Sequence, residues 1–372
     1  MLRIAGQVAV VSLVVLAGLW VWGNMTTGMA AARMTFSLDF LRLTAGFPIA
    51  EGPITYSPTD TYGHAYLVGL TNTLMVSILG IVLSTLLGVV VGVARLSTNW
   101  LVNRVAAVFV ELMRNTPLLV QLVFIYILLL QLPGVRDAIA LPGPTYLSQR
   151  GLFLPRPLTE PGFGPWLGLA VAGIVVALVA ARWAAGREAA GQPTYRARLV
   201  GVLAMLGIPI LSWVALTPMT FELPEQGRFN FSGGASFSPE FTALLVGLTI
   251  YTAAFIGETV RGGIQAIGRG QVEAAHSIGL TPTQTLRLIV FPQALRIIIP
   301  PLTSQYLNLL KNSSLAVAIG YPELFNVSRT MANQTANPVA VLFLVMGTYL
   351  CFSLVTSALM NIYNHRVRIV ER

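Results

Sequence analysis

Eight stretches of the chain are almost entirely apolar, and polar or turn-forming segments separate them. A helix needs roughly 20 apolar residues to cross the hydrocarbon core of a bilayer, and each stretch is about that long. They lie near residues 4–23, 66–94, 105–132, 165–182, 199–216, 241–262, 293–319 and 339–362. This pattern predicts an all-α polytopic membrane protein with about eight transmembrane helices.

Composition agrees with that prediction. The chain is 55% hydrophobic and only 10% charged, with a mean hydropathy of +0.73, whereas roughly 25% of the residues in a soluble domain are charged. The single cysteine, Cys351, lies inside the last apolar stretch, so the chain cannot form an internal disulfide.

The first apolar stretch has two interpretations. It could be a signal peptide that is cleaved near Met29–Ala32. However, its apolar run is longer than the roughly 7–15 residues of a signal core, and Trp20 and Trp22 are typical of side chains at a membrane interface. We therefore expect an uncleaved anchor helix.

The distribution of arginine sets the expected topology. With the N-terminus inside, 14 of the 23 basic residues fall in cytoplasmic segments and 7 in the longer outer segments. Basic residues concentrate in short cytoplasmic loops of membrane proteins, so eight spans with both termini in the cytoplasm are expected. The net charge of +9 thus reflects membrane topology and gives no reason to expect nucleic acid as a partner.

Small residues recur every four positions in the second apolar stretch. Such a stripe lets a neighbouring helix approach closely within lipid, because no large side chain intervenes. We expect it to serve packing alone. Its members are Gly80, Ser84, Gly88 and Gly92.

A polar segment between the sixth and seventh stretches has the pattern of two short helices. Glu273 is expected in the first turn of one helix, where a carboxylate suits the positive helix end. Gly279 is expected to close that helix in the left-handed conformation. Thr281 and Gln284 form a capping box that begins the second helix, and Pro292 is expected to end it.

A helix pair of this kind could also read DNA. Apolar stretches of spanning length at 241–262 and 293–319 hold it at the membrane, so a DNA-binding role is remote. The predicted topology places the pair in the cytoplasm.

Two glutamate–arginine pairs, each three residues apart, lie in predicted spans: Glu111 with Arg114, and Glu258 with Arg261. Residues three apart share a helix face and can pair. A charge at membrane depth is costly unless it is paired or hydrated. The four side chains therefore either lock the inner ends of the helices as ion pairs or line the path or gate of a zwitterionic solute.

Lys311 is the only lysine, against 22 arginines, and it lies deep in the seventh stretch. Its ammonium could hold a carboxylate of the solute, or it could bind helix-end carbonyls near a backbone break expected after Pro300 and Pro301. It is not part of a phosphate-binding loop, which requires Gly-x-x-x-x-Gly-Lys-Ser/Thr. The chain thus cannot bind ATP in that way.

No catalytic or metal-binding arrangement is apparent. The three histidines, His64, His276 and His365, lie in separate loop or terminal positions, and no Ser/His/Asp set or metal-ligand cluster accompanies them. We expect neither an enzyme nor a cofactor on this chain.

The polar helix pair resembles the loop through which type I ABC importers contact their ATPase. The family pattern is Glu-Ala-Ala, three residues, Gly, nine residues, Ile, any residue, Leu, Pro, and the chain departs from it only at Phe291. The resemblance implies that this loop couples the chain to an ATPase subunit. The matching residues are Glu273, Ala274, Ala275, Gly279, Ile289 and Pro292.

Further segments resemble the polar amino-acid branch of these permeases. They include Asn72-Thr-Leu, Glu111-Leu-Met-Arg114-Asn-Thr-Pro, Glu258-Thr-Val-Arg261-Gly-Gly and Lys311-Asn-Ser-Ser-Leu. The resemblance implies import of L-amino acids across the bacterial inner membrane. It also implies four kinds of partner: a periplasmic amino-acid-binding protein, a second permease, two ATPase copies that carry ATP and Mg²⁺, and membrane lipid.

The resemblance also divides the chain. Residues 66–132 and 241–372 would form a five-helix permease core, with the coupling loop at 271–292. Residues 1–65 would add an anchor helix and an outer loop. Residues 133–240 would be an insertion with two further helices, whose outer loops either meet an extracytoplasmic partner or merely connect the spans. The rival functions are an ion-coupled secondary transporter of small polar solutes and, remotely, a membrane-bound DNA-binding regulator.

Overall fold

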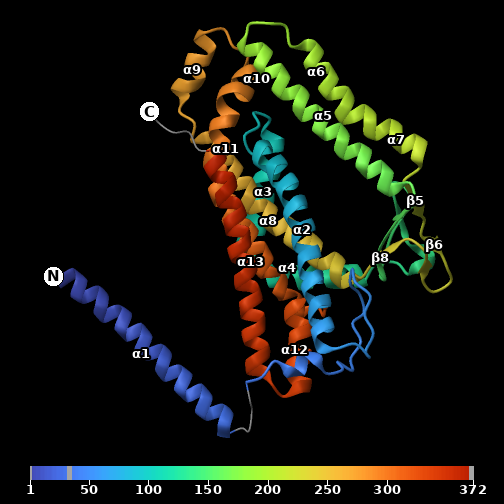
Figure 1. Ribbon diagram of the computed structural model, residues 1–372, viewed down its shortest axis with the longest axis vertical. Helices are drawn as coiled ribbons and strands as arrows, with labels where there is room; N and C mark the ends of the chain where they lie inside the picture. Colours follow the sequence, from blue (N-terminus) through green and yellow to red (C-terminus); the bar gives the residue numbers. More distant parts are fainter. Residues whose placement is uncertain (1, 32–35, 368–372) are drawn as a thin grey trace. The chain divides into compact units, whose positions relative to one another are not determined.

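The computed structural model describes residues 2–31 and 36–367. Contacts between residues divide the chain into two units, Met1–Ile127 with Glu240–Arg372, and Leu128–Pro239 (Figure 1). Three arginines used in the topology prediction (Arg33, Arg368 and Arg372) and Ala32 of the candidate cleavage site lie outside the described residues.

The first unit is helical in its described part. Its α-helices are α1 (Leu2–Ala31), α2 (Tyr62–Ala94), α3 (Trp100–Asn115), α4 (Leu118–Leu130), α8 (Pro239–Gln265), α9 (Arg269–Ser277), α10 (Pro282–Thr285), α11 (Phe291–Asn312), α12 (Leu324–Thr335) and α13 (Pro338–Val367). Shorter segments are the 3₁₀ helices η1 (Asp39–Arg42) and η5 (Ser313–Ala318) and the π-helix η4 (Leu286–Val290).

The expected number of spans is confirmed. Among the described residues, seven helical stretches are long and apolar enough to cross a membrane, and a bent pair of helices would make an eighth. The stretches are Gly6–Gly28, Tyr62–Ala94, Phe163–Glu188, Tyr195–Leu216, Pro239–Gln265, Pro282–Ala318 and Pro338–Ile362.

The bent pair corrects the predicted third span. A single helix over 105–132 was expected, but α3 and α4 meet at an angle of 108°. Pro117 causes the break, because its ring disfavours helical backbone at Thr116, which is extended with ψ 139°. The buried Gln121 satisfies the freed backbone, since its Nε2 donates to the carbonyls of Met113 at 2.9 Å and of Thr116 at 3.1 Å.

The small-residue stripe serves packing, as predicted: Gly88 and Gly92 face α8, and Gly80 faces Leu309 of α11. A Cβ added to Gly88 would lie 2.6 Å from the Cβ of Ile256, and one added to Gly92 would lie 2.7 Å from the carbonyl oxygen of Gly257. Both distances are shorter than real contacts allow, so the helices meet backbone to backbone. Ser84, which belongs to the same stripe, is fully buried.

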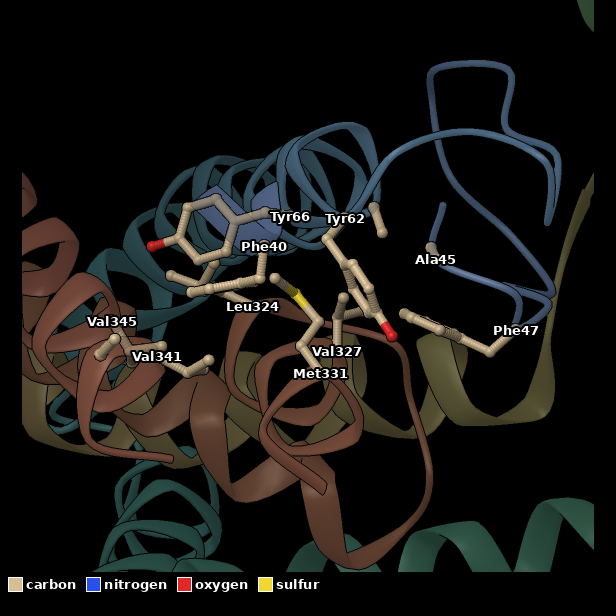
Figure 2. Packing of buried hydrophobic residues seen from close by; sticks show 12 residues of the cluster. Phe40, Ala45, Phe47, Tyr62, Tyr66, Leu324, Val327, Met331, Val341 and Val345 are labelled. Carbon is tan, nitrogen blue, oxygen red and sulfur yellow. The ribbon is translucent and has the colours of Figure 1, made fainter. Parts of the chain in front are cut away.

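A second packing centre joins the segment before α2 to α2, α12 and α13. Tyr62 and Tyr66 project from α2 over Val327 and Met331 of α12 (Figure 2). The rings pack in this core, and both hydroxyls are hydrogen-bonded. Tyr62 donates to Oε1 of Gln334 at 3.0 Å, and Tyr66 shares a 2.6 Å hydrogen bond with Thr348 of α13. The core therefore fixes α12 between two spanning helices.

The second unit contains a helical hairpin and small antiparallel sheets. Its helical segments are η2 (Val135–Asp137), α5 (Phe163–Ala189), α6 (Tyr195–Val202), the π-helix η3 (Leu203–Gly207) and α7 (Ile208–Leu216). Its strands are β1 (Ile139–Leu141), β2 (Thr145–Ser148), β3 (Gly151–Leu154), β4 (Arg156–Thr159), β5 (Met219–Glu222), β6 (Glu225–Gln226), β7 (Phe231–Ser232) and β8 (Ala235–Phe237).

These strands were not predicted, because the segments that contain them were expected to be outer loops. One sheet has the order β1-β2-β3-β8, and β4-β5 and β6-β7 form two-stranded ribbons. Phe231 stacks on Phe153 at 4.3 Å and on Tyr146 at 5.0 Å between ring centroids. This small aromatic core makes the segments a folded region and not extended connectors.

Candidate functional site

The predicted helix pair is present in α9 and α10. Gly279 has φ +83°, as expected, and two hydrogen bonds close α9 around it, from the N–H of Leu280 to the carbonyl of Ala275 at 3.1 Å and from Gly279 to His276 at 3.0 Å. These bonds form a Schellman motif. Thr281 and Gln284 then form the predicted capping box.

One detail of the prediction is wrong. Glu273 does not lie in the first turn of its helix, because α9 already begins at Arg269, with Gly268 as its N-cap. Its carboxylate is consequently too far from the helix start to stabilise the dipole, whose effect is confined to the first turn. The side chain of Glu273 is exposed and remains available for a partner.

Pro292 does not end the second helix. The π-helix η4 follows α10 directly, and α11 continues from Phe291 through Pro292. In an α-helix, the proline ring would clash with the carbonyl four residues earlier. The N–H of Phe291 instead bonds to Leu286, five residues earlier, and this wider turn accommodates the ring.

The backbone break expected after Pro300 and Pro301 is also absent. Both prolines lie inside α11, which ends only at Asn312. Helices in membrane proteins tolerate proline because surrounding structure holds the freed backbone groups. The change of backbone conformation occurs at Ser313, where the 3₁₀ helix η5 begins.

Side chains of α9, its C-cap, η4 and the first residue of α11 are largely exposed. Ala275 is only 3% exposed and anchors α9, but Ile278 is 76% exposed and Phe291 is 51% exposed. Leu286 and Leu288 are similarly open. Exposed apolar side chains grouped on one loop are typical of a surface that binds another protein. Of the residues that match the family pattern, Glu273, Ala274, Gly279 and Pro292 are exposed and Ile289 is partly buried.

Glu258 is the centre of an ionic cluster at one end of α8. It pairs with Arg261 one turn later, as predicted. It also binds Arg95, whose Nη1 lies 3.0 Å from Oε2 of Glu258. Arg95 is the C-cap of α2, and Nδ2 of Asn103 donates to its carbonyl at 2.5 Å. From the sequence, Arg95 was recognised only as a basic residue of a cytoplasmic loop, because its partner Glu258 is remote in the chain.

Glu111 and Arg114 do not form the second predicted ion pair. Both side chains are exposed on α3, and no salt bridge joins these two described residues. The guanidinium of Arg114 lies instead 5.2 Å from the ring centroid of Phe255 on α8, in a cation–π contact. Arg114 thus approaches the Glu258 cluster, and Glu111 does not take part in it.

Lys311 lies apart from that cluster. Its exposed side chain is in the last turn of α11, where a cation complements the helix dipole. The other end of α11 packs near Glu258, through Ile298 against Val260. Thirteen residues of helix separate Ile298 from Lys311, or about 20 Å. The five ionisable candidates therefore do not form one site.

Glu323 is a buried ionisable residue that sequence reasoning missed. Its side chain has 0% exposure and caps α12 by accepting from the N–H groups of Phe325 at 2.9 Å and Asn326 at 2.7 Å. The hydroxyl of Tyr349 on α13 donates to it at 3.2 Å. Burial raises the pKa of the Glu323 carboxyl to about 7. Glutamate is an uncommon cap, so the sequence carried little signal.

The start of α12 is tied to α2 as well. The N–H of Leu324 donates to Oγ1 of Thr73 at 3.0 Å, and Nδ2 of Asn72 donates to the carbonyl of Pro322 at 2.9 Å. Asn72 and Thr73 are fully buried. Polar side chains in this part of α2 thus position the segment that follows η5 by specific hydrogen bonds.

Among the described residues, no group of three or more His, Cys, Asp or Glu side chains could hold a metal ion. The arrangement can transmit movement but has no apparent means of catalysis among the described residues. It consists of an exposed helix pair between two spanning helices, an ionic cluster near that pair, and a capped helix, α12, held between α2 and α13.

Comparison with known proteins gives a consistent result. The model of the family described as "Binding-protein-dependent transport system inner membrane component" matches residues 173–369, and so begins inside the predicted insertion. The chain is 43% identical over 369 residues to the General L-amino acid transport system permease protein AapQ of Rhizobium johnstonii, covering 98% of this chain and 92% of the relative.

Two further comparisons extend it. The chain is 42% identical to the Putative amino-acid ABC transporter permease protein YhdX of Escherichia coli, over 98% of this chain and 93% of the relative. A crystal structure of an amino acid ABC transporter with histidines is similar with a TM-score of 0.50 and 21% identity, covering 82% of this chain and 95% of that chain. At that identity the structural likeness concerns the fold alone.

Proposed function

Because the chain belongs to the family of binding-protein-dependent transport system inner membrane components, we propose that it is the membrane-spanning subunit of an ATP-driven importer of L-amino acids. The observation that carries the proposal is the similarity to amino-acid transport permeases over 98% of the chain. Neither an ion-coupled secondary transporter nor a DNA-binding regulator has such support.

The chain is a transport component, and ATP hydrolysis would take place on a separate ATPase that binds ATP and Mg²⁺. Two ATPase copies would assemble with this chain and a second permease, and a periplasmic amino-acid-binding protein would deliver the solute. The protein is a multi-pass membrane protein, and we place it in the bacterial inner membrane with both termini in the cytoplasm.

Coupling would take place at α9 and α10. The exposed apolar side chains of this helix pair and of the η4 segment that follows it suit a cleft on the ATPase, and Glu273 adds an exposed carboxylate. Closure of the ATPase dimer on binding ATP would displace the pair. Because α9 follows α8 closely and α10 is continuous with α11, the displacement would move both spanning helices and switch access from one side of the membrane to the other.

The ionisable residues would have two roles. Glu258 and Arg261, with Arg95, would hold the ends of α2 and α8 together near the coupling loop, and Arg114 would support them through Phe255. Lys311 would line the solute path and contact the carboxylate of the amino acid. Glu111, which is exposed and outside the cluster, remains a candidate for a polar wall of that path.

Reconstitution tests the proposal. The chain would be purified with the products of its neighbouring genes and placed in proteoliposomes with its binding protein, and uptake of a panel of labelled L-amino acids would be measured. We expect uptake that requires ATP and the ATPase. Uptake by the chain alone, driven by an ion gradient, would refute the assignment.

A further inference from the structure

The turn between α5 and α6 carries an excess of positive charge. Four arginines lie between residues 182 and 198, and Glu188 is the only acidic residue among them. Glu188 pairs with Arg198 at 3.0 Å, and both side chains are about two-thirds exposed. Within the described part of the chain, the other three arginines have no carboxylate partner. They are Arg182, Arg187 and Arg196.

Two of these guanidinium groups are held in place while their outer edges stay free. Nε of Arg187 donates to the carbonyl of Pro193 at 3.1 Å, and its guanidinium lies 5.3 Å from the ring centroid of Trp183. Nε of Arg196 donates to the hydroxyl of Tyr195 at 2.8 Å. In each case the terminal amino groups remain available, and this fork matches the geometry of a phosphate group.

Aromatic residues place the turn at the depth of lipid headgroups. Trp183 is 50% exposed and Tyr195 is 61% exposed, as interfacial anchors are. At the other end of the hairpin, Trp166 meets Trp213 at 5.2 Å between ring centroids. Seventeen residues of helix between Trp166 and Trp183 span about 26 Å, close to the roughly 30 Å of a hydrocarbon core.

Between these aromatic ends, residues 167–181 of one helical limb and 199–212 of the other carry no charged side chain. The hairpin therefore meets lipid along its length and presents its arginines where the phosphates of that lipid lie. From this we propose that the turn binds the headgroup of an anionic phospholipid, with Arg182, Arg187 and Arg196 as its ligands. A lipid is favoured over a soluble protein because the anchors Trp183 and Tyr195 hold the arginines at the bilayer surface.

The test compares phosphatidylglycerol with phosphatidylcholine. The full chain, purified with its companion subunits and delipidated, is titrated with equimolar mixed micelles of the two lipids, and retained lipid is counted by native mass spectrometry. We expect enrichment of phosphatidylglycerol that falls about tenfold or more in the variant Arg182→Gln/Arg187→Gln/Arg196→Gln, since each basic residue near an anionic surface contributes measurably.

A matched control carries the same charge change in the same unit but outside the helical hairpin: Arg136→Gln/Arg156→Gln/Arg228→Gln. This control should keep the enrichment. The variant Arg182→Lys/Arg187→Lys/Arg196→Lys should keep part of the enrichment, because the positive charge remains while the forked guanidinium group is lost. Should the Gln variant fail to assemble, the three single variants must each lower the enrichment.

Three outcomes would overturn the proposal. One is equal enrichment in the wild type and the turn variants. Another is an equal fall in the control, which would indicate attraction by net charge alone. The third is loss of a companion subunit from the Gln variant with lipid retention unchanged, which would assign the turn to a protein partner.

Discussion

Arg95 and Glu258 form an ion pair across 163 positions of the sequence. Nη1 of the arginine lies 3.0 Å from Oε2 of the glutamate, and both side chains are about three-quarters or more buried. Because Arg95 caps α2 and Glu258 belongs to α8, the pair joins the ends of two spanning helices beside the loop that we assign to coupling.

A double-mutant cycle on Arg95→Gln and Glu258→Gln should reveal this link. Glu258→Gln leaves the partly buried Arg95 without a carboxylate, whereas Arg95→Gln leaves Glu258 with Arg261 alone. We therefore expect an interaction energy of about 1–3 kcal/mol between the two sites. The measurement is thermal unfolding of the purified complex, with uptake measured in parallel. Arg104→Gln, which changes an exposed arginine on α3, is the control; additive effects of the paired changes would contradict the prediction.

Substitutions of Gly279 should rank by their tolerance of the left-handed conformation. The residue has φ +83° and open space around it, so backbone strain alone decides the effect. We expect ATP-coupled uptake to decline in the order Gly, Asn, Ala, Val, with the protein still present in the membrane. Gly270→Ala, in the first turn of α9 with open space around it, should retain activity. Wild-type uptake and ATP hydrolysis in Gly279→Val would show that the turn has no coupling role.

Gly88 and Gly80 should respond differently to the same change. A Cβ at Gly88 would meet Ile256 at 2.6 Å, whereas one at Gly80 would meet only the flexible end of Leu309 at 3.4 Å. Gly88→Ala should therefore destabilise the protein by about 1–3 kcal/mol, and Gly80→Ala should have little effect. Thermal unfolding of both variants provides the comparison, and equal melting temperatures would argue against tight packing of α2 on α8.

The sequence predicted features that depend on nearby residues and missed those that depend on remote ones. Gly279 and the Thr281 capping box involve neighbours within a few positions, and both were correctly foreseen. The pairing of Arg95 with Glu258 needs the folded bundle, and the sequence alone could not show it. The continuation of the helix through Pro292 depends on a widened turn, and proline alone suggested a stop.

The outer strands were missed for a related reason. They are two to four residues long, too short for the alternation of apolar and polar residues to be recognised. Phe153 and Phe231 come from segments separated by the α5–α7 hairpin, so their stacking could not be seen in either segment. The assignment of residues 133–240 as an insertion in the permease core stays a prediction.

Glu323 should make stability depend on pH. Its pKa is raised from 4.5 to about 7 by burial, so the native state binds a proton that the unfolded state releases. Stability should therefore be highest below about pH 4.5 and should fall as the pH rises to 7, by roughly 3 kcal/mol. Burial also raises the pKa of the nearby Tyr321 hydroxyl, which therefore stays neutral in this range.

Thermal unfolding of the purified complex between about pH 4.5 and 8 checks this effect. In Glu323→Gln the fall should be reduced, because a neutral amide occupies the site at every pH. Glu111→Gln removes an exposed carboxylate and should leave the wild-type profile in place. An identical pH profile in Glu323→Gln and the wild type would show that the carboxyl does not control the transition.

Lys311→Gln should lower uptake about tenfold or more, because the carboxylate of the amino acid would lose a charged partner worth roughly 1.5–3 kcal/mol. Lys311→Arg should retain part of the activity. The ATP hydrolysis rate in the absence of solute should remain near that of the wild type. If uptake by Lys311→Gln is normal and only the melting temperature falls slightly, the lysine acts on the helix dipole alone.

The helix that starts at Pro282 continues without interruption to Asn312. It is about 46 Å long and has the proposed ATPase-contacting turn at one end and Lys311 at the other. Because this helix is continuous, it should move as one body, and any bending must occur where its ends meet other segments. Those places are the glycine turn at 279 and the 3₁₀ segment from Ser313, and a crosslink or a bulky side chain at either should arrest the transporter in one state.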